Sequence, residues 1–183
     1  MDAMRYLALF RGINVGGKNL LPMKTLIEMF QTAGCDRVRT HIQSGNVLFA
    51  AIPTVAATLP GSIATRIEET FGYRVPLMLR TAEQLAEVVA ANPFLTAGAP
   101  EAALHVMFLA GPPNPSRIEA LDPGRSPPDE FLVRGQEIFL NLPNGMGRTK
   151  LLNAYFDGKL ATISTARNWR TVTKLLELME APP

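Results

Sequence analysis

The sequence contains little of what several protein classes require. One cysteine among 183 residues excludes an intramolecular disulfide framework, and two well-separated histidines leave no Cys/His set with zinc spacing. We therefore expect no metal site and no cofactor. No stretch approaches about 18 consecutive apolar residues, and the first residues lack the pattern of a secretory signal. These absences predict a cytoplasmic protein without a membrane segment.

Strong charge of either sign is also missing. Lysine and arginine number 18 and aspartate and glutamate 16, which gives a formal net charge of +2. The chain therefore has neither a polybasic arm of the kind that binds nucleic acid nor an acidic tail. Any basic function must come from local clustering of residues. At 183 residues, the chain is long enough to bury most of the surface that its unfolded form exposes.

The first eighty residues predict the element order β-α-β-β-α-β. Continuous apolar runs indicate buried strands, alternating residues followed by a tight turn indicate a hairpin, and apolar residues at helical spacing indicate helices. Strands are expected at residues 6–10, 38–42, 47–49 and 75–79, with one helix from Pro22 to Gly34 and another from Ser62 to Gly72. This order is typical of a ferredoxin-like, split βαβ layer of helices on a sheet.

The same order then restarts without its last strand. Thr81 and Gln84 fit a capping box that opens a linking helix, which Asn92-Pro93 ends. Further strands are expected at 104–109, 131–133 and 138–140, helices at 114–121, 151–158 and after Asn168, and an extended piece at 161–164. We predict an α+β protein with two ferredoxin-like halves and mostly antiparallel sheets. The expected parts are residues 1–80, a linking helix and loop at 81–101, and residues 102–183 with a C-terminal helix.

The loop FRGINVGGKN, residues 10–19, raises the question of phosphate binding. From Gly12 to Lys18 it reads G-x-x-x-x-G-K, as in a P-loop. Asn19 stands where a Ser or Thr would hold magnesium, and the helix begins only near Pro22, so a nucleotide-hydrolysing P-loop is not favoured. Two interpretations remain. The loop is either a strand-to-helix connection with glycines at positive φ or a magnesium-free loop that binds an anion or polar ligand.

Three other polar segments could contribute to such a site: residues 43–46, 144–150 and 165–170. Each also has a structural interpretation, as a hairpin turn, a flexible loop, and a helix start with Trp169 in the core and Asn168 as the cap. None contains a carboxylate, so together they suit holding an anion better than acid–base chemistry. The candidate ligand-binding residues are Arg11, Asn14, Lys18, Asn19, Gln43, Ser44, Asn46, Arg167, Asn168 and Trp169.

Several segments resemble a known family when they are taken in order. They are RGINVGGKN, HIQSGNVLF, NPF, LHVMFL, EIFLNLPNGMGRTKL and TARNWRTVTKLLELM. Together they resemble the bacterial domain of unknown function 1697 over roughly residues 5 to 179. The resemblance implies an α+β, bacterial and intracellular protein with two ferredoxin-like halves, and it implies no activity or catalytic residues. One departure is His41, where members often have Tyr.

Three functions stay open from the sequence. The first is binding of an anionic, phosphate-bearing ligand, such as a nucleotide or nucleic acid, through glycine-rich basic loops. The second is an enzyme acting on a phosphorylated or acyl substrate, with Ser44 or Asp157 as the catalytic group. The third is an interaction protein whose motifs only build turns. A homodimer is compatible with each.

Overall fold

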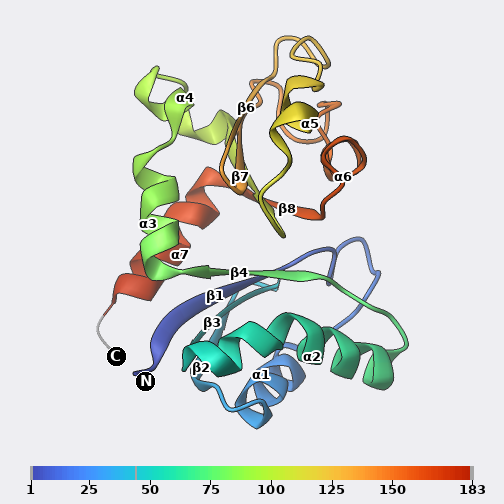
Figure 1. Cartoon of the computed structure of the whole chain (residues 1–183), viewed down its shortest axis with the longest axis vertical. Helices are drawn as coiled ribbons and strands as arrows, with labels where there is room; N and C mark the ends of the chain where they lie inside the picture. The colour runs from blue at the N-terminus through green and yellow to red at the C-terminus, as the bar shows by residue number, and fades with distance from the viewer. Residues whose placement is uncertain (1, 44, 182–183) are drawn as a thin grey trace. The chain divides into compact units, whose positions relative to one another are not determined.

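The computed structural model describes residues 2–43 and 45–181, and the chain divides into two compact units (Figure 1). The first unit takes its residues from Met1–Leu85 and Leu176–Pro183, and the second is Ala86–Leu175. Two helices cross the boundary in sequence, α3 (Ala82–Ala90) and α7 (Trp169–Glu180). The first unit is therefore built from two separate stretches of the chain.

The first unit has the element order β-α-β-β-α-β. Its elements are β1 (Met4–Phe10), α1 (Met23–Thr32), β2 (Asp36–His41), β3 (Asn46–Ala51), α2 (Pro53–Phe71) and β4 (Leu77–Thr81). The strands form one sheet in the order β2-β3-β1-β4, and all neighbours are antiparallel. Figure 1 shows α1 and α2 on the same face of this sheet.

The core of the first unit lies between this sheet and its two helices. Tyr6, Ala8 and Phe10 alternate along β1 and point into one apolar cluster. Phe30 of α1 and Ile63 of α2 belong to the same cluster and are almost fully buried. Burying a side chain of this size stabilises the fold by about 1.5–3 kcal/mol, so the alternation fixes which face of β1 meets the helices.

The second unit repeats the strand order of the first. After α3 come α4 (Pro93–Thr96), the 3₁₀ turn η1 (Glu101–Ala103), β5 (Leu104–Leu109), α5 (Pro115–Glu119), β6 (Glu130–Arg134), β7 (Glu137–Asn141), α6 (Asn153–Leu160) and β8 (Ser164–Asn168). Its sheet has the order β6-β7-β5-β8, again antiparallel throughout. The predicted α+β fold with two ferredoxin-like halves is confirmed.

Helix α2 is longer than the sequence pattern predicts, because it begins at Pro53 rather than at Ser62. Ala56 and Leu59 extend the buried stripe by two turns toward the N-terminus. Pro60 lies inside the helix and lacks an N–H, yet the apolar stripe continues on both sides of it. Ser62 is therefore an interior residue, and its hydroxyl donates to the Leu59 carbonyl at 3.4 Å.

The fourth strand of the second unit also differs from the expectation, which placed an extended piece at 161–164. Ala161 has a left-handed backbone (φ 51°) and ends α6, so extended structure begins later. Antiparallel pairing with β5 then places β8 at Ser164–Asn168. No helix of the described residues has the length and apolar character needed to cross a membrane.

Candidate functional site

The loop after β1 is held by its own polar side chains. Five residues between positions 12 and 19 have positive φ: Gly12, Asn14, Gly16, Gly17 and Asn19. The Asn14 side chain accepts from the Leu21 N–H at 2.8 Å and donates to the Leu21 carbonyl at 3.0 Å. The Asn19 side chain donates to the Gly12 carbonyl at 2.9 Å. Both asparagines therefore brace the connection between strand and helix.

The structure brings two of the predicted polar segments together. Asn14 Nδ2 also donates to the Gln43 carbonyl, at 3.1 Å, and the Phe10 N–H donates to the Gly45 carbonyl at 2.8 Å. Gly45 has φ 78°, and a Cβ at this position would lie 2.6 Å from the Phe10 Cβ. Only glycine satisfies both conditions without displacing the backbone. Ser44 lies outside the described residues.

Asn46 is fully buried at the start of β3. Its side chain donates to the His41 carbonyl at 3.1 Å and so closes the hairpin between β2 and β3. Lys18 and Gln43 are exposed polar side chains in this region, beside the exposed apolar Val15, Leu20 and Ile42. Arg11 is half-buried, and its N–H donates to the Pro76 carbonyl. The loop pair thus presents cationic and amide groups next to an internal asparagine framework.

The remaining predicted ligand residues lie in the second unit and are largely interior. Arg167 is buried, and its Nη1 donates at 2.8 Å to the Thr165 hydroxyl and to the Ala166 carbonyl. Burial lowers the pKa of Arg167 to about 10. The Asn168 side chain accepts from the Thr171 N–H and caps α7, and Trp169 is only 1% exposed. The cap and core positions agree with the structural interpretation of this segment.

The carboxylate that the enzyme hypothesis used is also part of a structural network. Asp157 accepts a hydrogen bond from the Ser164 hydroxyl at 2.7 Å, and that hydroxyl accepts from Asn153 at 2.9 Å. Ser164 is fully buried. These contacts tie α6 to β8, so Asp157 orients two elements of the second unit.

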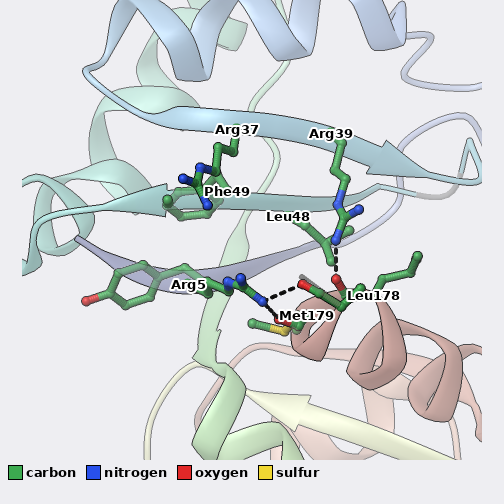
Figure 2. Close-up of a pocket in the computed structure, with 10 residues that line it drawn as sticks. Arg5, Arg37, Arg39, Leu48, Phe49, Leu178 and Met179 are labelled. Atoms are coloured by element: carbon green, nitrogen blue, oxygen red, sulfur yellow. Dashed lines mark hydrogen bonds between the residues drawn. The ribbon is translucent and has the colours of Figure 1, made fainter. Parts of the chain in front are cut away.

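A pocket of about 310 Å³ lies in the first unit, and none of the nine predicted ligand residues that the structure describes lines it (Figure 2). It is lined by three arginines, Arg5, Arg37 and Arg39, together with apolar residues of β3 and of the C-terminal end of α7. None of its lining residues is a carboxylate. The lining therefore concentrates positive charge without a carboxylate to balance it.

Strand pairing places these arginines around the pocket. Arg5 of β1 pairs with Ala50 of β3, and Arg39 of β2 pairs with Leu48, two residues away on the same face. The register of β2 shifts between Asp36 and Arg39, and Arg37 in this bulge has φ 52°. The bulge therefore re-aims the arginine that would otherwise follow the regular pleat.

The last turn of α7 closes one side of the pocket, as Figure 2 shows. Arg5 Nη1 donates to the Met179 carbonyl at 2.5 Å and to the Ala181 carbonyl at 2.7 Å, and Arg39 Nη2 donates to the Leu178 carbonyl. Carbonyls at a helix C-terminus have no partner within the helix and carry partial negative charge. Two of the three arginines thus already hold an electronegative group.

Arg37 differs from the other two arginines. It is exposed, as Arg39 is, but within the described part of the chain it has neither a hydrogen-bond nor an ion-pair partner. Sequence reasoning places Arg37 and Arg39 on one polar face of a strand, but the approach of Arg5 and of α7 depends on contacts more than 130 residues apart in the chain. The Arg-x-Arg pattern at residues 37–39 is the only part of this pocket that the sequence of β2 could have indicated.

Two titratable side chains outside this pocket, those of Cys35 and His105, are shielded from solvent by the fold. The pKa of Cys35 is raised to about 11, mainly by burial and further by the nearby Asp36 carboxylate, so its thiol stays protonated near neutral pH. Burial lowers the pKa of His105, whose Nδ1 lies 3.3 Å from the Ala103 carbonyl. Among the described residues, no three His, Cys, Asp or Glu side chains are grouped to hold a metal ion.

Comparison with known proteins supports the fold and the family. One solved structure, the conserved bacterial protein SP0830 from Streptococcus pneumoniae, is similar with a TM-score of 0.74 and 23% identity. The match covers 97% of this chain and 99% of that one. Among curated proteins none matches. The family described as "Protein of unknown function (DUF1697)" matches residues 4–139, and the chain belongs to this family.

Proposed function

We propose that the chain binds a small phosphate-bearing molecule, such as a nucleotide, in the pocket lined by Arg5, Arg37 and Arg39. One observation carries the proposal: three guanidinium groups surround a pocket of about 310 Å³ whose lining contains no carboxylate. A site of this size falls within the range of small-ligand pockets, about 300–1,000 Å³.

The chemistry of arginine favours an oxyanion as the ligand. Each guanidinium has five N–H donors in a planar fork that matches the oxygens of phosphate. Arg5 and Arg39 each donate some of their N–H groups to carbonyls at the end of α7, and their other N–H groups can donate to a ligand. Arg37 is exposed and has no such carbonyl partner among the described residues. Leu48 and Phe49 also line the pocket and provide apolar surface for the rest of a ligand.

The loop around Lys18 stays a second candidate for contact with the anion. Lys18 is exposed next to glycine N–H groups, which is the arrangement that prompted the phosphate-binding interpretation of the sequence. The loop belongs to the first unit, as the pocket does. Substitutions at the two places distinguish them, because each removes one cation at a different site.

Calorimetric titration and thermal unfolding of the full chain test the proposal. The probes are a nucleoside monophosphate, inorganic phosphate and a short single-stranded RNA. A ligand at about one hundred times its Kd adds roughly 2.7 kcal/mol to the free energy of unfolding. Arg37→Ala removes charge-assisted hydrogen bonds worth about 1.5–3 kcal/mol and should weaken binding about tenfold or more.

Arg66→Ala is the matched control, because Arg66 lies on α2 and does not line the pocket. It should leave the affinity unchanged. Equal weakening by Arg37→Ala and Arg66→Ala, or the absence of binding by every probe, would contradict the proposal. If Lys18→Ala weakens binding and Arg37→Ala does not, the ligand is held at the loop. Preference for the RNA over the nucleotide would identify a polymeric ligand.

A further inference from the structure

Strand β6 lies at one end of its sheet and pairs with β7 alone among the described strands. At the two ends of β7, the Leu142 N–H donates to the Ala103 carbonyl and the Gln136 carbonyl accepts from the Leu109 N–H. The even-numbered residues of β7 therefore direct their backbone N–H and C=O groups toward β5. The odd-numbered residues of β7 therefore bond to β6, and their partners are Glu130, Leu132 and Arg134. It follows that the N–H and C=O groups of residues 131 and 133 point away from the sheet.

These outward groups form an open edge. In the described part of the chain, no hydrogen bond outside the ladders uses the backbone of Phe131 or Val133. The register between β6 and β7 runs from Glu130 to Arg134 without a shift, and the strand contains no proline. Edge strands that must not pair are usually short or charged, or carry a bulge or a proline. β6 has five residues, of which Glu130 and Arg134 are charged, but it has neither a bulge nor a proline.

The charge pattern of β6 is complementary to itself. If a second copy approaches antiparallel with a two-fold axis at Leu132, Phe131 lies opposite Val133 of the second copy and both exchange backbone hydrogen bonds. In the same register Glu130 lies opposite Arg134 of the second copy, and this pair occurs twice. Leu132, which is 37% exposed, meets its own counterpart between the two charge pairs. The outward backbone groups and the side chains thus select the same register.

We propose that two copies of this chain associate through β6, so that their second-unit sheets join into one antiparallel sheet of eight strands. The proposal is independent of ligand binding, because β6 contributes no residue to the arginine-lined pocket. One strand pair of five residues is a small contact compared with a standard interface of about 1,600 Å². The dimer is therefore concentration-dependent rather than obligate.

Sedimentation velocity of the full chain tests the interface. Over about a hundredfold range of protein concentration, the wild type should show mass-action dimerisation. Glu130→Arg places two positive side chains opposite each other at both ends of the contact and should weaken the dimer at least about tenfold. Arg134→Glu should do the same with two negative side chains. Glu119→Arg is the matched control for Glu130→Arg, because it makes the same change in net charge at an exposed residue of α5 instead of on β6. It should leave the dimer intact.

Mixing the two charge variants tests whether residues 130 and 134 face each other across the interface. A Glu130→Arg chain and an Arg134→Glu chain carry opposite charges at both facing positions, so the mixture should form a heterodimer although each variant alone is monomeric. Recovery of the heterodimer also shows that both variants are folded. The proposal is overturned by a wild type that stays monomeric throughout, by equal weakening with Glu119→Arg, or by a mixture that remains monomeric.

Discussion

The two units share one strand order but differ in their loops and edges. The connection from first strand to first helix runs over positions 11–22 in the first unit and only 110–114 in the second. Edge strand β2 has a bulge at Arg37, whereas edge strand β6 is regular. The shared topology follows from the apolar alternation of the strands. The two proposed binding surfaces, the arginine-lined pocket and the open edge of β6, therefore involve edge strands that differ between the units.

One buried residue is repeated between the units. Arg80 pairs with Leu7 on β1, and Arg167 pairs with Val106 on β5, each one residue before a capping residue. Both are buried, and both donate from Nη1 to the carbonyl of the preceding residue at 2.8 Å. The register of the fourth strand is therefore preserved in detail, although the sequences of the two halves show no obvious repeat. Substitutions at equivalent positions can test how far the likeness extends.

The largest difference between equivalent positions should appear at the hairpin glycines. Gly45 and Gly135 both have positive φ, which costs a residue with a Cβ about 1–2 kcal/mol. A Cβ at Gly45 would also lie 2.6 Å from the Phe10 Cβ, whereas at Gly135 the nearest atom is 3.9 Å away. The clash adds about 1–3 kcal/mol, so Gly45→Ala should destabilise the fold by about 2–5 kcal/mol. Denaturant unfolding of both variants measures the difference. Equal losses would show that the packing around Gly45 yields easily.

Smaller and equal effects are expected at the helix caps that follow the fourth strands. Thr81 and Gln84 form a reciprocal capping box, with bonds of 2.9 and 3.2 Å, and Asn168 caps α7 with a bond of 2.8 Å. Thr81→Ala and Asn168→Ala should each cost about 1 kcal/mol of unfolding free energy. Thr70→Ala is a suitable control, since that hydroxyl bonds only within its own helix, to the Arg66 carbonyl. A loss at one cap alone would break the equivalence of the two helices.

The smallest effect concerns pH and one histidine. His105 pairs with Asn168 as Tyr6 pairs with Thr81, so a histidine occupies this register in the second unit but not in the first. Burial lowers its pKa in the folded state below 6.5, so the unfolded chain binds the proton more readily. Its contribution to stability is therefore present above pH 6.5 and is lost as the pH falls below that value. His105→Gln should reduce the loss of stability between neutral and mildly acidic pH, as followed by denaturant midpoints. An unchanged pH dependence would exclude His105 as a source.

Much of the fold could be predicted because the strands and caps follow local rules. The apolar run of β1, the capping box at Thr81 and the Asn114-Pro115 start of α5 all lie where the pattern predicts them. The start of α2 was missed because Pro60 suggests a helix boundary, whereas burial of Ala56 and Leu59 outweighs its missing hydrogen bond. Local signals fail where tertiary packing decides.

The candidate site was harder to predict than the fold. Asparagines such as Asn14 and Asn46 resemble ligand-binding groups in sequence, yet their side chains satisfy backbone carbonyls of neighbouring turns. The arginine-lined pocket depends on a strand register and on a helix end that is distant in sequence. Neither is encoded within a short window, so motif reading could not find Arg5.

The return of α7 to the first unit has a consequence for biosynthesis. Residues 1–85 contain every strand of their sheet and are translated before the second unit, but Leu176 and the following residues of the same unit are translated after it. Arg5 and Arg39 can therefore meet the carbonyls of residues 178, 179 and 181 only after the whole second unit has been translated. The arginine-lined pocket is consequently the last part of its unit to be assembled, and a nascent chain exposes these cations until the helix arrives.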